Sequence, residues 1–451
     1  MADSPADWLP ALAARFDSQS TDVERFRSYA RGNAPLPEMG PNLRASWVAF
    51  QKKARTDFGG LAIGSLADRL IPNGIQVGGA SDDPRALQAQ RIWRDNRCDV
   101  QVSAAIRDYL ETSWGYLVSG VDSDGLAVVT RESPDHFIAL TDPLRPWRAT
   151  AALKVWRVHE YDVDFARVWI EGMAQTFVRP ARVDGRLVAG ASAGQWREYG
   201  PVEEYVGFPP VSVLDRDAPF LAPHLDIIDR INLTKLQRLV TTAMQAFRQR
   251  AVKGDLEDRD EAGNEIDWGK VFEPAPGALW EIPDGIDIWE SQQTDIRPML
   301  EAEKSDAREF AAVTRTPISV LVPEGANQSA EGAAQAKEGQ IMQARQEIAR
   351  ISPAIEAVFV HGLRAEGADL SNATVEILWS NPAHVSLSEQ YAAAAQAKAA
   401  GLPLRHILRD ILSMSPQQIS RVEQDAAAEQ LNAALLIGSA MNGAPNAPVT
   451  G

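Results

Sequence analysis

The spacing of apolar residues changes twice along this chain, and these changes limit the folds that it can adopt. Up to about Thr112 the apolar residues recur every three or four positions, which predicts amphipathic helices. From Tyr116 to Val206 they alternate with polar residues, which predicts strands. From Pro223 onwards the helical spacing returns. This order is typical of an α+β protein, and we expect residues 1 to about 215 to form one α+β domain.

The first helical region carries recognisable start signals. Ser4 before Pro5 predicts a helix, because a hydroxyl can cap a helix whose first residue needs no N–H partner. Thr21 and Glu24 match a capping box, which predicts a second helix that ends at Gly32. Further helices are predicted from Asn42, with a weak point at Gly59-Gly60 and a turn at Pro72-Asn73-Gly74, from Asp82-Asp83-Pro84, and over 99–112.

The middle region is predicted to be an antiparallel meander. The runs YLVSGV and LAVVT flank Asp122-Ser123-Asp124-Gly125, which predicts a hairpin. Asp184-Gly185 predicts another tight turn. Further strands are expected at 153–158, 165–170, 175–179, 186–189, 196–199 and 203–206.

Long helical patterns fill the rest of the chain. They are predicted near 225–247, 296–313 and 329–366, and in the tail at 386–400, 403–412 and 416–441. Pro353 lies inside the longest pattern and predicts a kink, because proline removes one backbone donor and clashes with the preceding turn. The run TVEILWSNP predicts one further strand after that helix.

Two segments between these helices have a different character. Between Lys253 and Glu290 there are 12 acidic and 3 basic residues, with short strand candidates at GALWEI and IDIWE, which predicts a small acidic β-rich lobe. Pro317 to Ser329 (PISVLVPEGANQS) is predicted to be a loop with an apolar middle. Such a middle either lies exposed or inserts into a core, and the sequence leaves both open.

Composition argues against several classes of function. A formal net charge of −16 does not suit bulk attraction to nucleic acid or anionic lipid. Cys98 is the only cysteine, which excludes an intrachain disulfide and a cysteine zinc cluster. The acidic start MADSPADWLPALAARF does not look like a secretion signal, and no apolar run nears the length of a membrane span. We therefore expect a soluble protein of a reducing compartment that does not enter a membrane.

The search for catalytic motifs gives one weak candidate. Gly190-Ala191-Ser192-Ala193-Gly194 matches the GxSxG pattern, but the flanks do not predict the buried strand and the helix that a nucleophile elbow needs. The chain has no GxxxxGK[ST] phosphate loop and no GxGxxG fingerprint. The six histidines do not pair at metal-binding spacing. We expect no catalytic residue, no cofactor and no metal.

The succession of these parts resembles the portal proteins of long-tailed double-stranded DNA bacteriophages, the head-to-tail connector family. No single motif decides the resemblance, which covers about residues 20 to 440. The stretches that carry it are Phe26 to Pro37, Asn42 to Gly74, Asn96, Tyr109 to Val121, Ser133-Pro134, Ala151 to Trp156, Pro276 to Pro283, Leu300 to Pro317 and Ser329 to Glu338.

The resemblance implies a portal fold of the α+β class, with an α/β wing, a two-helix stem, a small β-rich clip, a long kinked helix and a helical crown. The domains that it implies are 1–222 for the wing, 223–248 for a stem helix, 249–292 for the clip, 293–315 for the second stem helix, 316–330 for the tunnel loop, 331–385 for the long kinked helix and a returning wing strand, and 386–451 for the crown and a flexible tail. The crown portion is short, and its extent is open.

The resemblance also implies a function. Twelve copies would form a ring at one capsid vertex, and this ring would conduct double-stranded DNA without reading its sequence. The protein would be located in the virion and, during assembly, in the host cytoplasm. The ring would nucleate capsid assembly and would bind the terminase large subunit, the major capsid and scaffolding proteins, and a head-completion or adaptor protein. The implied sites are the tunnel loop at Val320, Leu321, Val322, Pro323, Glu324 and Gly325, the helix kink at Pro353, and a docking surface in the clip at Asp255, Glu257, Asp258, Asp260 and Glu261.

Physical chemistry gives one reason for the acidic composition. Each phosphate that binds a lysine or arginine releases counterions, and breaking that contact then costs free energy. An acidic channel wall avoids such contacts and would let DNA slide with little friction. Acidity that only keeps the protein soluble is the alternative. Two other functions stay open from the sequence, a soluble acidic adaptor that scaffolds other proteins and an enzyme with a spatially assembled site in which Ser192 would be the nucleophile.

Overall fold

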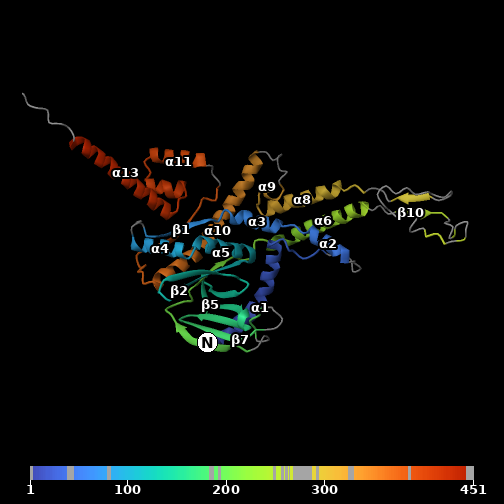
Figure 1. Cartoon of the computed structure of the whole chain (residues 1–451), viewed down its shortest axis with the longest axis horizontal. Helices are drawn as coiled ribbons and strands as arrows, with labels where there is room; N and C mark the ends of the chain where they lie inside the picture. Colours follow the sequence, from blue (N-terminus) through green and yellow to red (C-terminus); the bar gives the residue numbers. More distant parts are fainter. Residues whose placement is uncertain are drawn as a thin grey trace, which may run out of the picture. The chain divides into compact units, whose positions relative to one another are not determined.

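A computed structural model describes the structure of the chain, and it forms two compact units. The first unit comprises Met1–Pro35, Asp57–Asp226 and Glu309–Gly451, and the second comprises Leu36–Thr56 and Ile227–Arg308. Figure 1 shows the elements of both. The described residues are 4–37, 45–78, 83–181, 187–190, 195–246, 250–254, 259, 263, 265–267, 287–290, 294–322, 330–383 and 387–442.

The first helix, α1 (Pro5–Ala30), begins where the sequence predicts. The Ser4 side chain accepts a hydrogen bond from the Asp7 N–H and caps it. The predicted second start at Thr21 and Glu24 is wrong, because α1 runs unbroken through both residues. Its buried face continues from Phe16 to Val23, and this packing outweighs a local capping preference.

The other early helices follow the predicted order with two corrections, the first being that the predicted weak point Gly59-Gly60 lies inside a helix and the interruption falls at residues 55–57. They are α2 (Ala45–Ala54) in the second unit, and α3 (Phe58–Ala67), α4 (Pro84–Asp95) and α5 (Cys98–Thr112) in the first. Asp83 caps α4 by accepting the Arg85 N–H at 2.9 Å. The turn predicted at Pro72-Asn73-Gly74 is instead the start of strand β1 (Pro72–Val77), which pairs antiparallel with β12 (Val375–Trp379). Gly74 has φ +138° at the register shift between Pro72 and Gly74, so this glycine forms a bulge.

An eight-stranded sheet forms the centre of the first unit. Its order is β3-β2-β9-β5-β6-β7-β8, with β4 paired to β5. The predicted hairpin is confirmed, since Val121 pairs with Ala127 across a turn in which Gly125 has φ +76°. The strands are β2 (Trp114–Val121), β3 (Ala127–Glu132), β4 (Phe137–Asp142), β5 (Arg145–Val158), β6 (Val163–Ile170), β7 (Met173–Pro180), β8 (Arg197–Glu204) and β9 (Val211–Asp215).

Two of the strand predictions differ from this sheet. The strands predicted at 196–199 and 203–206 belong largely to one strand, β8. Residues 187–189 form no strand, because the Ala189 N–H donates to Asp17 of α1 instead of to a neighbouring strand. Asp184-Gly185 lies outside the described residues.

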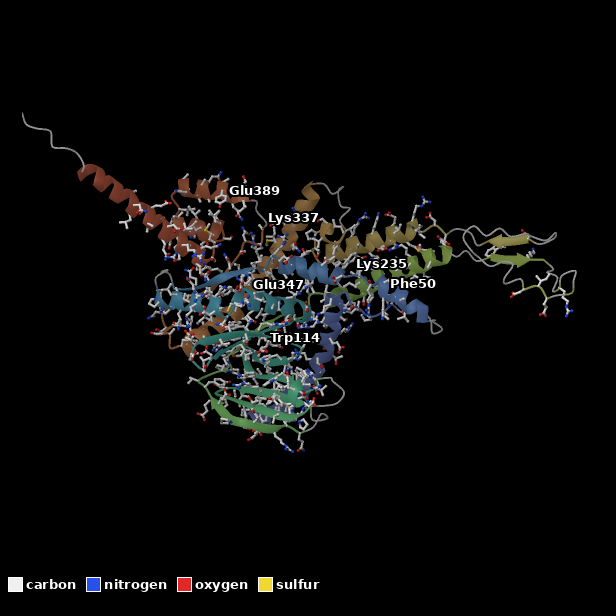
Figure 2. The ribbon with its side chains drawn as sticks, in the orientation of Figure 1. Phe50, Trp114, Lys235, Lys337, Glu347 and Glu389 are labelled. Atoms are coloured by element: carbon white, nitrogen blue, oxygen red, sulfur yellow. The ribbon has the colours of Figure 1, made fainter. Side chains whose placement is uncertain are left out.

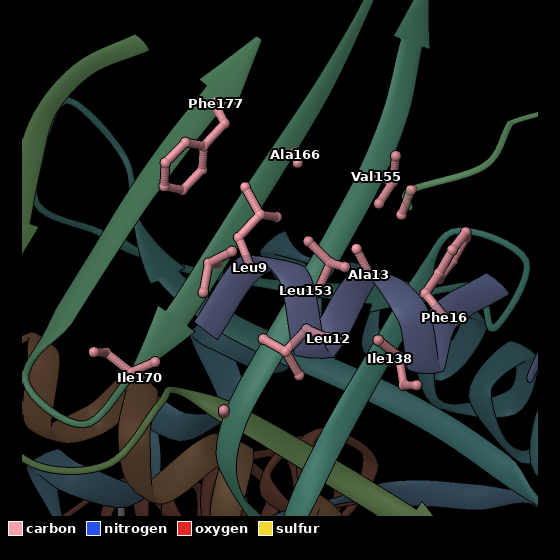
Figure 3. Close-up of a cluster of buried hydrophobic side chains, with 13 residues drawn as sticks. Leu9, Leu12, Ala13, Phe16, Ile138, Leu153, Val155, Ala166, Ile170 and Phe177 are labelled. Carbon is pink, nitrogen blue, oxygen red and sulfur yellow. The ribbon is translucent and has the colours of Figure 1, made fainter. Parts of the chain in front are cut away.

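One face of the sheet is covered by α1. Figure 3 shows Leu9, Leu12 and Phe16 of α1 lying against the side chains of β4, β5, β6 and β7. This apolar cluster is closed to solvent, and Phe16 keeps only 2% of its surface exposed. The strand residues in the cluster are Ile138, Ala151, Leu153, Val155, Ala166, Val168, Ile170 and Phe177, joined by Ala13 of α1 and by Ala189.

A long helix, α10 (Ala330–Ala365), packs against strands β2, β9 and β12 of the same unit. Its apolar face is largely buried, with Ile348 partly exposed and with these residues buried: Ile341, Ile351, Ile355, Val358, Phe359 and Leu363. Phe359 stacks on Trp93 of α4, with 5.6 Å between the ring centroids. The tail is helical as predicted, with α11 (Leu387–Ala399), α12 (Leu404–His406), a π-helical turn (Ile407–Ile411) and α13 (Pro416–Asn442).

Candidate functional site

Two long helices of the second unit form the first candidate element. They are α6 (Leu225–Ala246) and α8 (Arg297–Val313), close to the predicted bounds. As residue numbers rise along α6 the partners on α8 fall, so the helices run antiparallel. Ion pairs join Arg230 to Asp306 at 3.1 Å, Lys235 to Glu303 at 3.6 Å, and Arg238 to Glu303 at 3.0 Å. Near the far end of α6, Gln245 donates to the Thr294 carbonyl at 2.7 Å.

A buried asparagine fixes α6 within its unit. Asn232 sits in the apolar row of α6 and has no exposed surface. Its side-chain oxygen accepts hydrogen bonds from both the N–H and the hydroxyl of Thr56, each at 2.9 Å. A buried side-chain oxygen needs hydrogen-bond donors, so these two bonds from Thr56 fix the position of α6 against the segment that follows α2.

A two-stranded ladder lies in the chain between these two helices. Strand β10 (Arg250–Lys253) pairs antiparallel with β11 (Asp287–Glu290), with Arg250 in register with Glu290 and Lys253 with Asp287. The strand predicted at IDIWE is therefore confirmed. Trp289 on β11 is 55% exposed. The predicted docking residues Asp255, Glu257, Asp258, Asp260 and Glu261 lie outside the described residues.

The segment predicted to be a loop with an apolar middle begins as a helix. Residues Ile318–Leu321 form the short helix α9, which packs against α3 in the first unit. Leu321 is buried, with 6% of its surface exposed, whereas Val320 and Val322 are partly exposed. The sequence left open whether this apolar middle inserts into a core. Leu321 does so, because transfer of an apolar side chain out of water lowers the free energy of the folded chain. Pro323, Glu324 and Gly325 lie outside the described residues.

Pro353 lies inside α10, as predicted, and α10 continues past it for 12 residues. The adjacent Ser352 hydroxyl donates to the Ile348 carbonyl at 2.7 Å and accepts the Trp379 indole N–H at 3.0 Å. Hydroxyls that donate to the carbonyl four residues back often bend helices. The kink at Pro353 stays a prediction.

Polar contacts anchor the first half of α10 within its unit. The Tyr109 hydroxyl of α5 donates to Glu347, and Arg216 lies 3.4 Å from the same carboxylate. Burial raises the pKa of Tyr109, and the neighbouring Glu347 adds to that effect, so the phenol stays protonated as a donor. About two turns earlier, Gln340 accepts from Arg69 at 2.7 Å and donates to Ser65 at 2.8 Å.

The GxSxG segment has a structural explanation at the end that the structure describes. Asp17 of α1 accepts the N–H groups of Ala189 and Gly190 at 2.7 and 2.8 Å. Arg179 of β7 donates to the Gly190 carbonyl at 3.3 Å. Gly190 therefore belongs to a partly buried polar cluster that holds the chain against the sheet, while Ser192 lies outside the described residues.

The sole cysteine offers no reactive group. Cys98 has no exposed surface, and burial raises the pKa of its thiol to about 12, with Asp99 adding to the shift. A thiol needs to ionise to react or to bind metal, so Cys98 is inert in the folded chain. Among the described residues no three or more His, Cys, Asp and Glu side chains gather in a group that could hold a metal ion.

A groove of about 1350 Å³ lies between α10 and the face of the sheet opposite α1. Its cations are largely engaged, with Lys154 bonded to Glu132 at 2.7 Å and Arg148 stacked 3.6 Å from the Phe208 ring centroid. Burial, followed by the charges of Arg364 and Arg148, lowers the pKa of His361 in its wall. The sequence gives no signal for this groove, because its residues come from strands and a helix far apart in the chain.

The helices can be compared with what a membrane crossing requires, and the whole chain can be compared with known proteins. None of the helices in the described part of the chain combines the length and the hydropathy that a membrane crossing requires. No curated protein matches the chain. The solved structures that are similar in fold include the following three, each with a TM-score below 0.5.

The three structures come from gene transfer agent (GTA) particles. A chain of the virion of a native GTA particle has a TM-score of 0.45 and 14% identity, covering 87% of this chain and 99% of that one. A chain of the neck of a native GTA particle, computed with C12 symmetry, has 0.41 and 13%, covering 87% and 99%. A chain of the neck of an empty GTA particle, computed with C6 symmetry, has 0.43 and 15%, covering 86% and 98%.

The family comparison covers most of the chain. The family described as "Phage portal protein, SPP1 Gp6-like" matches residues 17–432. This range includes the helix pair, the ladder between the two helices, α9 and the whole of α10. The chain therefore belongs to the phage portal protein family of the SPP1 Gp6-like type, whose members are structural components of the phage particle and not enzymes.

Proposed function

We propose that identical copies of this chain close into a ring at one capsid vertex and form the conduit through which the phage genome enters and leaves. The observation that carries the proposal is the order of elements within the family match, α6, the β10–β11 ladder, α8, α9 and then α10. A closed ring requires head-to-tail contacts between identical subunits whose rotation closes. Membership of the family supports a ring of twelve copies in the virion.

We assign the parts of the conduit as follows. Residues 1–222 would form the wing, α6 and α8 the stem within 223–248 and 293–315, and 249–292 the clip. Residues 316–330 would line the channel as the tunnel loop, 331–385 would form the long kinked helix with the returning strand β12, and 386–451 would form the crown and tail. The antiparallel pairing of α6 with α8 and the ladder between them support the stem and clip assignments.

The ring would act on DNA by position and not by recognition. Passage of a genome must ignore sequence, so no side chain needs to read base edges. A net charge of −16 disfavours tight binding to phosphates, which suits a low-friction channel. The sequence has no phosphate loop for ATP, so the energy for packaging would come from ATP hydrolysis by a partner.

Partners would dock at both ends and around the rim of the ring. The acidic segment within the clip would bind the terminase large subunit during packaging and a head-completion or adaptor protein afterwards, since acidic surfaces steer basic partners. The wing would contact the major capsid and scaffolding proteins and nucleate shell assembly in the host cytoplasm. A clip that is merely solvated is the alternative for the acidic segment.

The tunnel-loop assignment gives a first prediction. Replacing Val320 and Val322 by serine, with the buried Leu321 kept, should leave ring formation intact and reduce the fraction of DNA-filled heads. The physical reason is that the loop would contact the duplex through partly exposed apolar side chains, which serine shortens and makes polar. The measurement is the DNA content of particles from a portal-deficient phage supplied with the variant.

The matched control for this prediction is Ser319→Ala, which changes the exposed neighbour in the same short helix. Packaging at the unaltered level by the double serine variant, in rings of normal size, would remove the role that we assign to Val320 and Val322. Loss of rings in the control as well would show that α9 serves folding instead.

A further inference from the structure

The basic residues of α6 are matched by carboxylates of α8. Lys235, labelled in Figure 2, and Arg238 share Glu303 at 3.6 and 3.0 Å. The three side chains are mostly buried, with 25%, 24% and 18% of their surfaces exposed for Lys235, Arg238 and Glu303. Salt screens partly buried pairs less than exposed ones, so this trio stays together at physiological ionic strength.

A single carboxylate therefore serves as the partner of two cations. Arg238 donates from Nε to Glu303 Oε2, and Lys235 Nζ approaches Oε1, so each base uses its own oxygen. The Arg238 contact is a charge-assisted hydrogen bond, which is directional, whereas Lys235 makes a longer ion pair. Removal of Glu303 would leave both bases without an ion-pair partner that the described residues provide.

A lysine or arginine that is already ion-paired gains little free energy by binding a phosphate. Binding of a lysine or arginine to DNA is driven by the release of counterions from the duplex. A basic side chain that is already paired with a carboxylate must first break that ion pair. In a ring every basic side chain is repeated in each subunit around the same channel. Even weak individual contacts with DNA would therefore give tight binding through multivalency. Because each basic side chain must break its ion pair with Glu303 before it binds a phosphate, the total free energy of these contacts stays small.

We propose that Glu303 is a positioning residue that acts as the internal counterion of Lys235 and Arg238 and so prevents the stem from gripping DNA. This inference rests on the proposed function, because it presumes that α6 and α8 form the wall of a DNA channel. It assigns to α8 a role beyond packing and explains how basic residues are tolerated in the stem helices.

The test is Glu303→Gln, made in the full chain and purified as rings. The probe is a linear double-stranded DNA fragment, titrated at a series of NaCl concentrations. We expect the variant ring to bind this DNA about tenfold or more tightly than the unaltered ring at low salt. We also expect a steeper dependence on salt, by roughly 0.9 in the logarithmic slope for each phosphate that a released base contacts.

Three variants separate the counterion role from other effects. Asp226→Asn removes the same charge from α6, and the structure gives Asp226 no ion pair among the described residues, so DNA binding should change less than about twofold. Glu303→Asp keeps a carboxylate and should restore weak binding. Lys235→Gln and Arg238→Gln combined with Glu303→Gln should also bind weakly, because no released bases remain.

Native mass spectrometry of each sample keeps the two proposals apart. If the unaltered chain forms no rings, the proposed function fails. If rings form and Glu303→Gln binds DNA with the affinity and salt slope of the unaltered ring, the counterion inference is overturned and the conduit stands. Should the variant not assemble alone, rings mixed with unaltered subunits serve instead, and affinity that does not rise with the variant fraction overturns the inference.

Discussion

Replacing Asp164 by alanine should lower the free energy of unfolding of the first unit by about 3–5 kcal/mol. Asp164 on β6 has no exposed surface and lies in register between Arg157 of β5 and Arg179 of β7. Its carboxylate contacts Arg157 at 2.7 Å and Arg179 at 3.5 Å. Alanine would remove the buried carboxylate that both guanidinium groups contact, and breaking a buried ion pair by removing one partner is strongly destabilising.

Urea unfolding, followed by tryptophan fluorescence, measures this effect. Trp196 is a suitable reporter, since the Arg179 guanidinium lies 4.0 Å from its ring centroid and its indole N–H donates to the Ala189 carbonyl at 2.9 Å. The control is Glu203→Ala, which removes the 58%-exposed partner of Arg167 and should cost less than about 1 kcal/mol. Equal losses in both variants would refute the importance that we give to the buried carboxylate.

Replacing Phe16 by alanine should destabilise the same unit by about 3–5 kcal/mol through a different mechanism. Phe16 is 2% exposed and lies in the cluster that joins α1 to the sheet (Figure 3). Truncation removes the transfer free energy of the ring and leaves a cavity that the flanking strands can only partly fill. The midpoint of urea unfolding should fall with little change in the slope.

The matched control is Leu87→Ala on α4, where the side chain is 55% exposed. This change should shift stability by no more than about 0.5 kcal/mol, because the side chain already lies largely in water. A Phe16→Ala protein as stable as the Leu87→Ala protein would show that α1 is not part of the core.

Hydrophobic periodicity was sufficient to predict the elements that pack along their whole length. The bounds of α6, α8 and α10 agree with the sequence to within one residue, because a helix that buries one face keeps its apolar spacing from end to end. The hairpin of β2 and β3 was predictable because its turn lies between the paired strands in the sequence.

Long-range pairing was not predictable in the same way. Strand β1 was mistaken for a turn because proline, asparagine and glycine favour turns locally, whereas its pairing with β12 depends on a segment about 300 residues later. The unbroken course of α1 past Thr21 and Glu24 likewise depends on the sheet beneath it, since packing can override a capping signal.

The candidate site was predictable in outline and not in its contacts. The sequence indicated two helices with an acidic lobe between them, and the structure adds that Glu303 serves two bases on the partner helix. Spacing within one helix shows which residues share a face, but not which residue of another helix they meet. The burial of Leu321 was open for the same reason, because it depends on α3.

Assembly of the unaltered chain into a ring is the most direct test of this account. The measurement is native mass spectrometry of the purified protein over a range of concentrations, together with electron microscopy of the same samples. We expect a dominant species at a multiple of the 49.2 kDa chain mass and annular particles with a central hole wide enough for a DNA duplex. A single species at 49.2 kDa at every concentration, with solid particles and no rings, would contradict the account.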